Sequence, residues 1–215
     1  MAVTHTVKQG ESLSAIAQAY GFTDWKKIYD HPDNREFKKK RPHPHILFPG
    51  DKINIPEKES KEESCSTEQK HRFKRIREGL KLRLAVKDFG FEPLANTACE
   101  LEIDGTVYSL TTDGEGMIEQ PISPSAEKAV LRFQDPLVPF DVAIPIQIGH
   151  LDPIEEITGQ KARLSNLGYY FGPPDGEDDE KFNIAVQEFQ CDHDLKVDGV
   201  CGPKTQDKLK AIHGC

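Results

Sequence analysis

The stretch THTVKQGESLSAIAQAYG (residues 4–21) carries the first fold signal in this 215-residue chain. Its first six residues read as a short strand, and Gly10-Glu11 predicts a turn. Ser12 is an N-cap candidate, because its hydroxyl can accept a hydrogen bond from an orphan helix amide. Apolar residues then recur at helical spacing, at Leu13, Ile16, Ala17 and Tyr20. We therefore expect a strand, a turn and an amphipathic helix.

The residues that follow complete a small unit. A second helix is expected to run from about Trp25 to His31, because the residue before Pro32 is disfavoured in the α region. Within the polar, basic stretch 34–45, the run Lys38–Arg41 is expected to be a solvated loop, with contact to wall carboxylates or teichoic phosphates as the alternative. Pro49-Gly50-Asp51 predicts a turn, and Lys52–Ile55 alternates like a strand. Residues 1–56 thus read as a β-α-α-β unit.

Charged and small polar residues fill positions 57–72, which we interpret as a linker because such a segment cannot bury enough apolar surface to order itself. Residues 73–150 then show strand patterns every 8–12 residues. Asp104-Gly105 between two apolar runs is a strong hairpin signal. We expect a small antiparallel β-sandwich of the transthyretin-like or immunoglobulin-like kind, acting as a spacer.

The last segment, residues 151–215, is expected to be a three-helix bundle. Its apolar residues Phe182, Ala185, Val186 and Phe189 fall at i, i+3, i+4 and i+7. Turns are predicted at 173–176 and at Asp198-Gly199. The fold class predicted for the whole chain is therefore α+β and multidomain.

Charge and composition exclude several classes of partner. The net charge is −8, with 9 basic and 6 acidic residues in 1–56 against 7 and 13 in 151–215. This balance argues against nucleic acid as the main partner. No apolar run is long enough for a membrane span, and the first residues, MAVTH, lack the pattern of a signal peptide. We therefore expect synthesis in the cytoplasm without classical export.

The five cysteines, Cys65, Cys99, Cys191, Cys201 and Cys215, match no metal-binding spacing. Free thiols are the default expectation in a cytoplasmic product, although a Cys191–Cys201 or Cys201–Cys215 bridge stays open. His43 and His45 lack a third metal ligand nearby in the sequence. No metal or other cofactor is expected.

The first unit resembles a LysM domain. The matching elements are HTVKQGESL (5–13), Ile16-Ala17, Tyr20-Gly21 and LFPGDKINIP (47–56). LysM domains bind N-acetylglucosamine units of peptidoglycan or chitin, in a groove between the loop after the first strand and the loop after the second helix. The resemblance implies glycan-binding roles for Gly10, Glu11, Ser12, Leu13, Asp30, His31 and Leu47. His31-Pro32 replaces the asparagine usual in the family, and a basic insertion, residues 38–45, lengthens the second loop.

The last segment resembles the three-helix peptidoglycan-binding domain often attached to cell-wall hydrolases. The matching elements are Arg163-Leu164, NLGY (166–169), Ala185-Val186, Phe189-Gln190, VDGV (197–200) and GPKT (202–205). Gln160-Lys161 departs from the family's Leu-Gln. The glycan-binding candidates are Tyr169 and Tyr170, whose rings can cover an apolar sugar face, with Asp198 and Gly199.

The order of the three units resembles that of wall-binding proteins associated with type VI secretion or phage-tail-like injection systems. This resemblance implies that the protein acts at the cell wall or periplasm after delivery by such a machine. We expect a non-catalytic peptidoglycan-binding protein that anchors or targets a partner. The alternative is a protein–protein scaffold or spike accessory of the apparatus, and a peptidoglycan hydrolase is a more distant one.

An enzyme is not expected because the acidic residues of the middle segment are scattered over turns and strand faces, whereas a glycosidase needs two facing carboxylates. Nor does the segment contain an HExxH or GxSxG motif.

Overall fold

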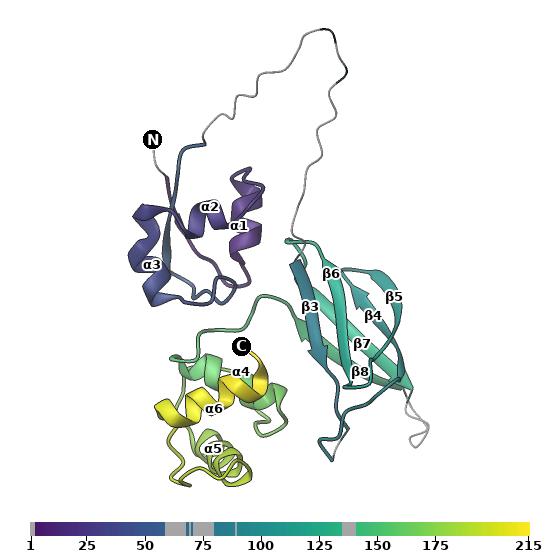
Figure 1. The fold of residues 1–215 in the computed structure, drawn as a ribbon. Helices are drawn as coiled ribbons and strands as arrows, with labels where there is room; N and C mark the ends of the chain where they lie inside the picture. Colours follow the sequence, from purple (N-terminus) through teal and green to yellow (C-terminus); the bar gives the residue numbers. More distant parts are fainter. Residues whose placement is uncertain (1–2, 59–67, 69, 71–79, 89, 135–140) are drawn as a thin grey trace.

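The computed structural model describes residues 3–58, 68, 70, 80–88, 90–134 and 141–215 (Figure 1). Helices and antiparallel sheets occur together, which confirms the predicted α+β class. The predicted linker, 57–72, lies almost entirely outside the described residues, as does Cys65. Among the described residues, no helix has the length and apolar character needed to cross a bilayer.

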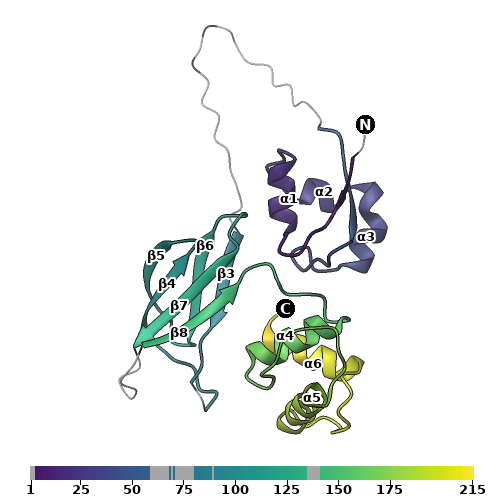
Figure 2. The same ribbon diagram turned by 180° about the vertical axis from the view of Figure 1, so that it is seen from behind.

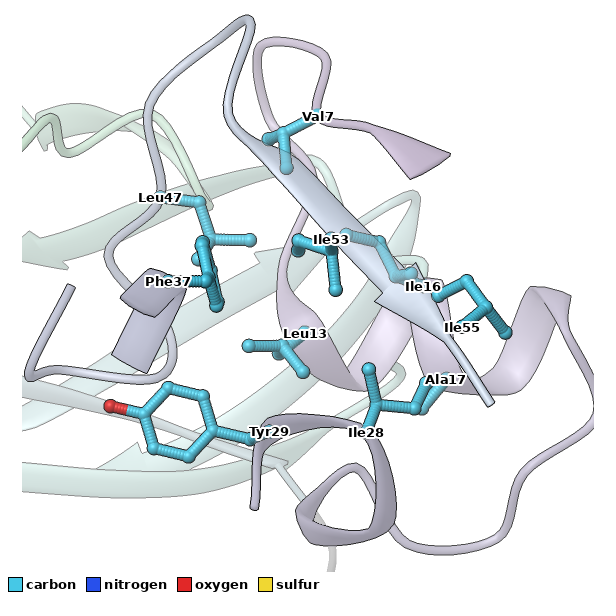
Figure 3. Packing of buried hydrophobic residues seen from close by; sticks show 10 residues of the cluster. All are labelled: Val7, Leu13, Ile16, Ala17, Ile28, Tyr29, Phe37, Leu47, Ile53 and Ile55. Atoms are coloured by element: carbon cyan, nitrogen blue, oxygen red, sulfur yellow. The ribbon is translucent and has the colours of Figure 1, made fainter. Parts of the chain in front are cut away.

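The N-terminal unit is built on two antiparallel strands, β1 (Val3–Thr6) and β2 (Lys52–Ile55), with His5 opposite Ile53. Helices α1 (Leu13–Ala19) and α2 (Lys26–Tyr29) lie between them in sequence. Ser12 caps α1 as predicted, because its hydroxyl accepts a hydrogen bond from the Ala15 amide at 3.2 Å. Figure 3 shows the apolar core that joins helices and strands: Val7, Leu13, Ile16, Ala17, Ile28, Tyr29, Phe37, Leu47, Ile53 and Ile55.

The loop prediction for the basic run 38–41 is wrong, because residues 38–40 are helical, although their side chains are exposed. A 3₁₀ turn (Pro32–Asn34) leads into a third helix, α3 (Arg35–Lys40). Phe37 on this helix is buried in the core. Arg41 is buried at the helix end and donates through Nε to Asp51 Oδ2 at 2.7 Å. The sequence of the basic run indicates only exposed side chains. In the structure, the buried Phe37 and the buried Arg41–Asp51 ion pair stabilise it as a helix.

The middle segment forms two antiparallel sheets, as the sandwich prediction requires. Strand β3 (Leu80–Ala85) pairs with β6 (Met117–Ile122). The second sheet has the order β5-β4-β7-β8, formed by Thr106–Thr111, Ala98–Ile103, Lys128–Gln134 and Asp141–Gln147. The hairpin at Asp104-Gly105 is present, and both residues have the positive φ of a tight primed turn. Pro121 lies in β6 opposite Lys81, in a two-stranded sheet where each strand has one unpaired edge among the described residues.

The C-terminal segment contains the three predicted helices, α4 (Ile157–Asn166), α5 (Glu180–Asp192) and α6 (Pro203–His213). Asp179 caps α5 by accepting from the Phe182 amide, Pro203 begins α6, and Gly214 ends it in the left-handed conformation. The core gathers apolar residues from all three helices, including Leu164, Phe189 and Leu209.

The N-terminal and C-terminal units meet although the sandwich separates them in sequence. In Figures 1 and 2 the chain leaving β8 passes beneath the loops of the N-terminal unit before it enters α4. Gln9 Nε2 lies 3.5 Å from Asp152 Oδ1 across this contact. The sandwich touches the C-terminal unit through Phe91, whose ring stacks on Tyr169 with the centroids 6.0 Å apart.

Candidate functional site

The loop after β1 is held by its own side chains. Gly10 has a φ of 84°, a conformation that favours glycine. Glu11 Oε2 accepts from the Lys8 amide and lies 2.8 Å from His5 Nε2, whose ring also contacts the Tyr20 hydroxyl. The Glu11 carboxylate is therefore committed to shaping the loop, and Ser12 is committed to capping α1. What the loop offers to a ligand is chiefly its backbone around Gly10.

The second loop adjoins the first through backbone hydrogen bonds. The Gly50 amide donates to the Val7 carbonyl and the Val7 amide to the Asp51 carbonyl, both at 2.9 Å. Asp51 organises this loop, because its carboxylate also accepts from the Phe48 amide and from Arg41. Burial alone would raise the pKa of Asp51, but the hydrogen bonds from Arg41, Lys40 and Phe48 hold it below its ordinary value. We call residues 8–12 and 43–50 together the LysM loop face.

The structure separates the residues that the LysM resemblance assigns to a groove. Gly10 and Glu11 present their backbone at the loop face. Leu47 belongs to the second loop, but its side chain, like that of Leu13, is buried in the core. Asp30 and His31 lie towards the other end of the two-stranded sheet. There, the Asn34 side chain joins the Ile28 carbonyl to the Asn54 backbone, beside Thr4. Asp30 is exposed and pairs with Lys38 at 2.6 Å.

Two histidines of the second loop were not singled out as ligand-binding candidates. The His45 ring packs edge-on against Trp25, with the centroids 5.0 Å apart, and His43 is exposed beside it. Partial desolvation lowers the pKa of His43, and the positive charge of Arg163 in α4 lowers it further. The second loop therefore faces the C-terminal unit, a relationship that sequence patterns do not reveal.

In the C-terminal unit the two tyrosine candidates differ in exposure. Tyr170 is buried, with its hydroxyl donating to the Pro173 carbonyl. Tyr169 is partly exposed and donates to Asp192 at 3.0 Å, while its ring lies between Phe91 and Phe189. Burial and the Asp192 carboxylate raise the pKa of Tyr169 to about 12. Only Tyr169 presents a ring edge near the surface.

Asp198 and Gly199 are tied to α5 by Gln190, a buried residue whose role the sequence did not indicate. Gln190 Oε1 accepts from the amides of Asp198 and Gly199 at 2.9 and 3.0 Å. Its Nε2 donates to Asp198 Oδ1 and to the Val200 carbonyl, both at 3.0 Å. Both polar atoms of the Gln190 side-chain amide therefore hydrogen-bond to the 198–200 turn and hold it in place.

This turn forms one wall of a pocket of about 190 Å³ between α4 and α5. The pocket is lined by Ile157, Gln160, Asp178, Phe182, Asn183, Gly199, Val200 and Cys201. With its amide oriented so that Nδ2 donates, Asn183 bonds the Gly199 carbonyl and Asp178 Oδ1, both at 3.1 Å. Val200 is 65% exposed at the rim, and burial raises the pKa of the Cys201 thiol to about 11. The pocket therefore combines neutral polar groups, one carboxylate and an apolar rim, a mixture suited to a small polar ligand.

Gln160 and Lys161, which differ from the Leu-Gln usual in the family, stabilise the fold of the C-terminal unit. Gln160 donates to the Ile154 carbonyl at 2.9 Å, and Lys161 is fully buried. Lys161 Nζ lies 2.6 Å from Asp175 and 2.9 Å from Asp179, above the rings of Tyr170 and Phe182. Burial lowers the pKa of Lys161, but these hydrogen bonds outweigh it and raise the pKa well above its ordinary value. Where the family usually has Leu-Gln, this chain therefore has a buried lysine that contacts acidic and aromatic side chains.

The N-acetylmuramoyl-L-alanine amidase CwlM of Mycobacterium tuberculosis (strain ATCC 25618 / H37Rv) is 34% identical over 55 residues, which is 26% of this chain. The match spans only 14% of that amidase. No solved structure matches the chain.

Two family models match. The model described as "LysM domain" matches residues 5–31, and the one described as "Putative peptidoglycan binding domain" matches residues 155–209. The first match ends before α3, whereas the pairing of β1 with β2 carries the folded unit on to Ile55. The chain therefore carries a LysM domain at its N-terminus and a three-helix peptidoglycan-binding domain at its C-terminus.

Proposed function

We propose that this protein binds peptidoglycan at two sites without cleaving it. The observation that carries the proposal is the presence of two domains of wall-binding families in one chain, one at each end. The LysM loop face would take the N-acetylglucosamine units of the glycan. The pocket beside Asn183 and Gly199 would take a second small polar group of the same polymer.

Two weak sites in one chain can give strong attachment to a polymer. Once the first site is occupied, the second meets its ligand at an effective concentration set by the tether between the sites. Here the two domains also contact each other, at Gln9 and Asp152, so their separation varies less than that of freely tethered domains. This arrangement favours two nearby attachment points on one strand or on neighbouring strands.

The candidate site residues support binding rather than catalysis. In the C-terminal pocket, Asp178 is the sole carboxylate among the lining residues, whereas glycosidases use two. The raised pKa of Cys201 keeps this thiol protonated at neutral pH, although a thiolate is the nucleophilic form. The proposal includes the anchoring of a partner, such as an injection machine, to the wall.

Two alternatives rest on specific observations. The partial match to an amidase favours a wall hydrolase, in which these domains would deliver a catalytic segment to its substrate.

The burial of Leu13, Leu47 and Tyr170 favours a protein scaffold of a secretion or phage-tail-like apparatus, because these residues present no ligand-binding surface. Both alternatives make different predictions for binding to purified wall.

The test is co-sedimentation of the full chain with insoluble peptidoglycan, with the supernatant assayed for released fragments. Val200→Asp would place a charge on the pocket rim, and Val107→Asp would place one on the sandwich at a comparably exposed valine. We expect the wild type and Val107→Asp to sediment without releasing fragments, and Val200→Asp to sediment less.

If the wild type stays in the supernatant, wall binding fails and the scaffold reading replaces it. If soluble fragments accumulate, the protein is a hydrolase. Equal sedimentation of Val200→Asp and Val107→Asp would remove the pocket from the proposal but leave wall binding in place.

A further inference from the structure

The segment Gly149–Asp152, which we call the strap, lies against the first loop of the LysM loop face. A β-carbon placed on Gly149 would lie 2.6 Å from the Gly10 carbonyl oxygen, which is closer than any side chain allows. A β-carbon placed on Gly10 would in turn meet the His150 ring at 3.3 Å. Together with the contact from Gln9 to Asp152, these two close approaches place the strap directly beside Gly10, which remains half-buried.

The sequence permits this approach because glycine stands on both sides of the contact. Gly149 has a φ of 78° and Gly10 a φ of 84°, so both are in the left-handed region that other residues seldom adopt. A larger residue at 149 would meet both conformational strain and the Gly10 backbone. The two backbones can therefore approach this closely because both positions are glycine.

The strap is held in place from both ends. On the sandwich side, the Ile148 amide donates to the Glu127 carbonyl at 2.9 Å. On the other side, Arg163 of α4 donates through Nη1 to the Asp152 carbonyl at 2.9 Å and is almost fully buried. The strap is therefore fixed by the two domains it connects, and the LysM domain rests on it.

We propose that the strap is an autoinhibitory cover of the LysM loop face, which a glycan must displace in order to bind around Gly10. The inference rests on the proposed function of that loop. In the structure the loop's free backbone around Gly10 is already occupied by the chain itself, and a sugar ring is far thicker than the space between two touching backbones. Ligand and strap therefore compete for one surface.

The cover is weak enough to open. Gly149 and His150 remain exposed to solvent, and the Gln9–Asp152 contact is long at 3.5 Å. Such a contact adds little free energy, so the open form is a minor but accessible state. Occupation of the LysM domain by glycan then releases the C-terminal domain from it, and by reciprocity the release of that domain raises the affinity for glycan.

The test measures binding of N-acetylchitotetraose, a soluble N-acetylglucosamine oligomer, to the full chain by calorimetry. Gly149→Ala breaks the close approach, and the double variant Gln9→Ala/His150→Ala removes side-chain contacts without straining the backbone. Gly105→Ala is the matched control, because Gly105 has a φ of 83° but open space at its β-carbon. Hydrogen exchange of the amides of residues 8–12 reports the cover without any ligand.

We expect Gly149→Ala and the double variant to bind roughly three- to tenfold more tightly than the wild type, because the apparent affinity falls with the fraction of binding-competent molecules. Exchange at residues 8–12 should accelerate in both, and Gly105→Ala should match the wild type. Equal or weaker binding by the strap variants, with accelerated exchange, would overturn the cover. If no variant binds the oligomer although exchange accelerates, the glycan proposal for the LysM domain fails and the inference falls with it.

Discussion

The ammonium nitrogen of Lys161 lies 2.9 Å from Asp179 Oδ2, although no part of the lysine side chain is exposed. The same carboxyl group caps α5, since its other oxygen accepts from the Phe182 amide. One acidic residue thus joins the first helix of the C-terminal domain to the start of the second. Two more contacts complete the arrangement, from Lys161 to Asp175 and to the ring of Tyr170.

Removal of this lysine should destabilise the C-terminal domain. Lys161→Ala leaves a cavity and two carboxylates without their cation. We expect a loss of about 2–4 kcal/mol, which is less than the about 3–5 kcal/mol of a fully buried pair because both carboxylates are at least one-third exposed. Lys161→Met keeps the volume and should cost less. Urea unfolding followed by circular dichroism measures the change, with Lys196→Ala at an exposed surface lysine as control. Equal stability of Lys161→Ala and Lys196→Ala would contradict the anchoring role.

Acid should destabilise the same domain through His213. Burial and the nearby charge of Arg163 lower the pKa of His213 from 6.5 to about 4. Between these two values the unfolded chain binds a proton that the folded one does not, so stability falls as the pH drops from about 6.5 to about 4. The slope can reach about 1.4 kcal/mol per pH unit for one histidine. His213→Gln should flatten the stability profile in this window, and an unchanged slope would show that His213 titrates normally.

Asn34 should be a stability determinant of the LysM domain. It is buried, and its amide group bonds the Ile28 carbonyl and both backbone groups of Asn54. Asn34→Ala would leave these backbone groups without partners at a cost of about 2–3 kcal/mol. The chain has a single tryptophan, Trp25, which packs on this domain's core, so its fluorescence reports the unfolding directly. The exposed Asn96→Ala in the sandwich should leave this transition unchanged.

Gln190 should control the pocket of the C-terminal domain. Gln190→Glu retains the acceptor for the Asp198 and Gly199 amides but faces the Asp198 carboxylate with a second negative charge. We expect the 198–200 turn to loosen, with faster hydrogen exchange at these amides and weaker sedimentation with peptidoglycan. The exposed Gln147→Glu in β8 makes the same chemical change away from this turn and is the control. Unaltered hydrogen exchange in Gln190→Glu would mean that the 198–200 turn is stable without the hydrogen bonds from Gln190.

Local signals predicted much of the fold. Ser12 as a cap, Asp104-Gly105 as a hairpin and the spacing of Phe182, Val186 and Phe189 each depend on neighbours within one turn or one helix. The helix at 35–40 was missed because it is stabilised from outside, by the contact of Arg41 with Asp51 ten residues later. Lys161 looked like a departure from a family pattern because its partners follow fourteen and eighteen residues later.

The candidate site was less predictable for the same reason. The resemblance named the loop at Gly10, but the residues that lie against this loop, Gly149 and His150, follow the whole sandwich. Phe91 stacks on Tyr169 from another domain with a left-handed φ of 63°, which no sequence pattern for phenylalanine suggests. Contacts between domains do not follow the helix or strand periodicity of either domain's sequence, so sequence patterns cannot predict them.

The contact between Gly10 and Gly149 joins residues 139 positions apart in the chain (149 − 10). During synthesis the LysM domain leaves the ribosome before the sandwich and the strap, and domains generally fold as they emerge. Its loop around Gly10 is then complete well before the ribosome reaches codon 149. A nascent chain therefore passes through a period in which this surface is open, and it can close only after the strap has emerged.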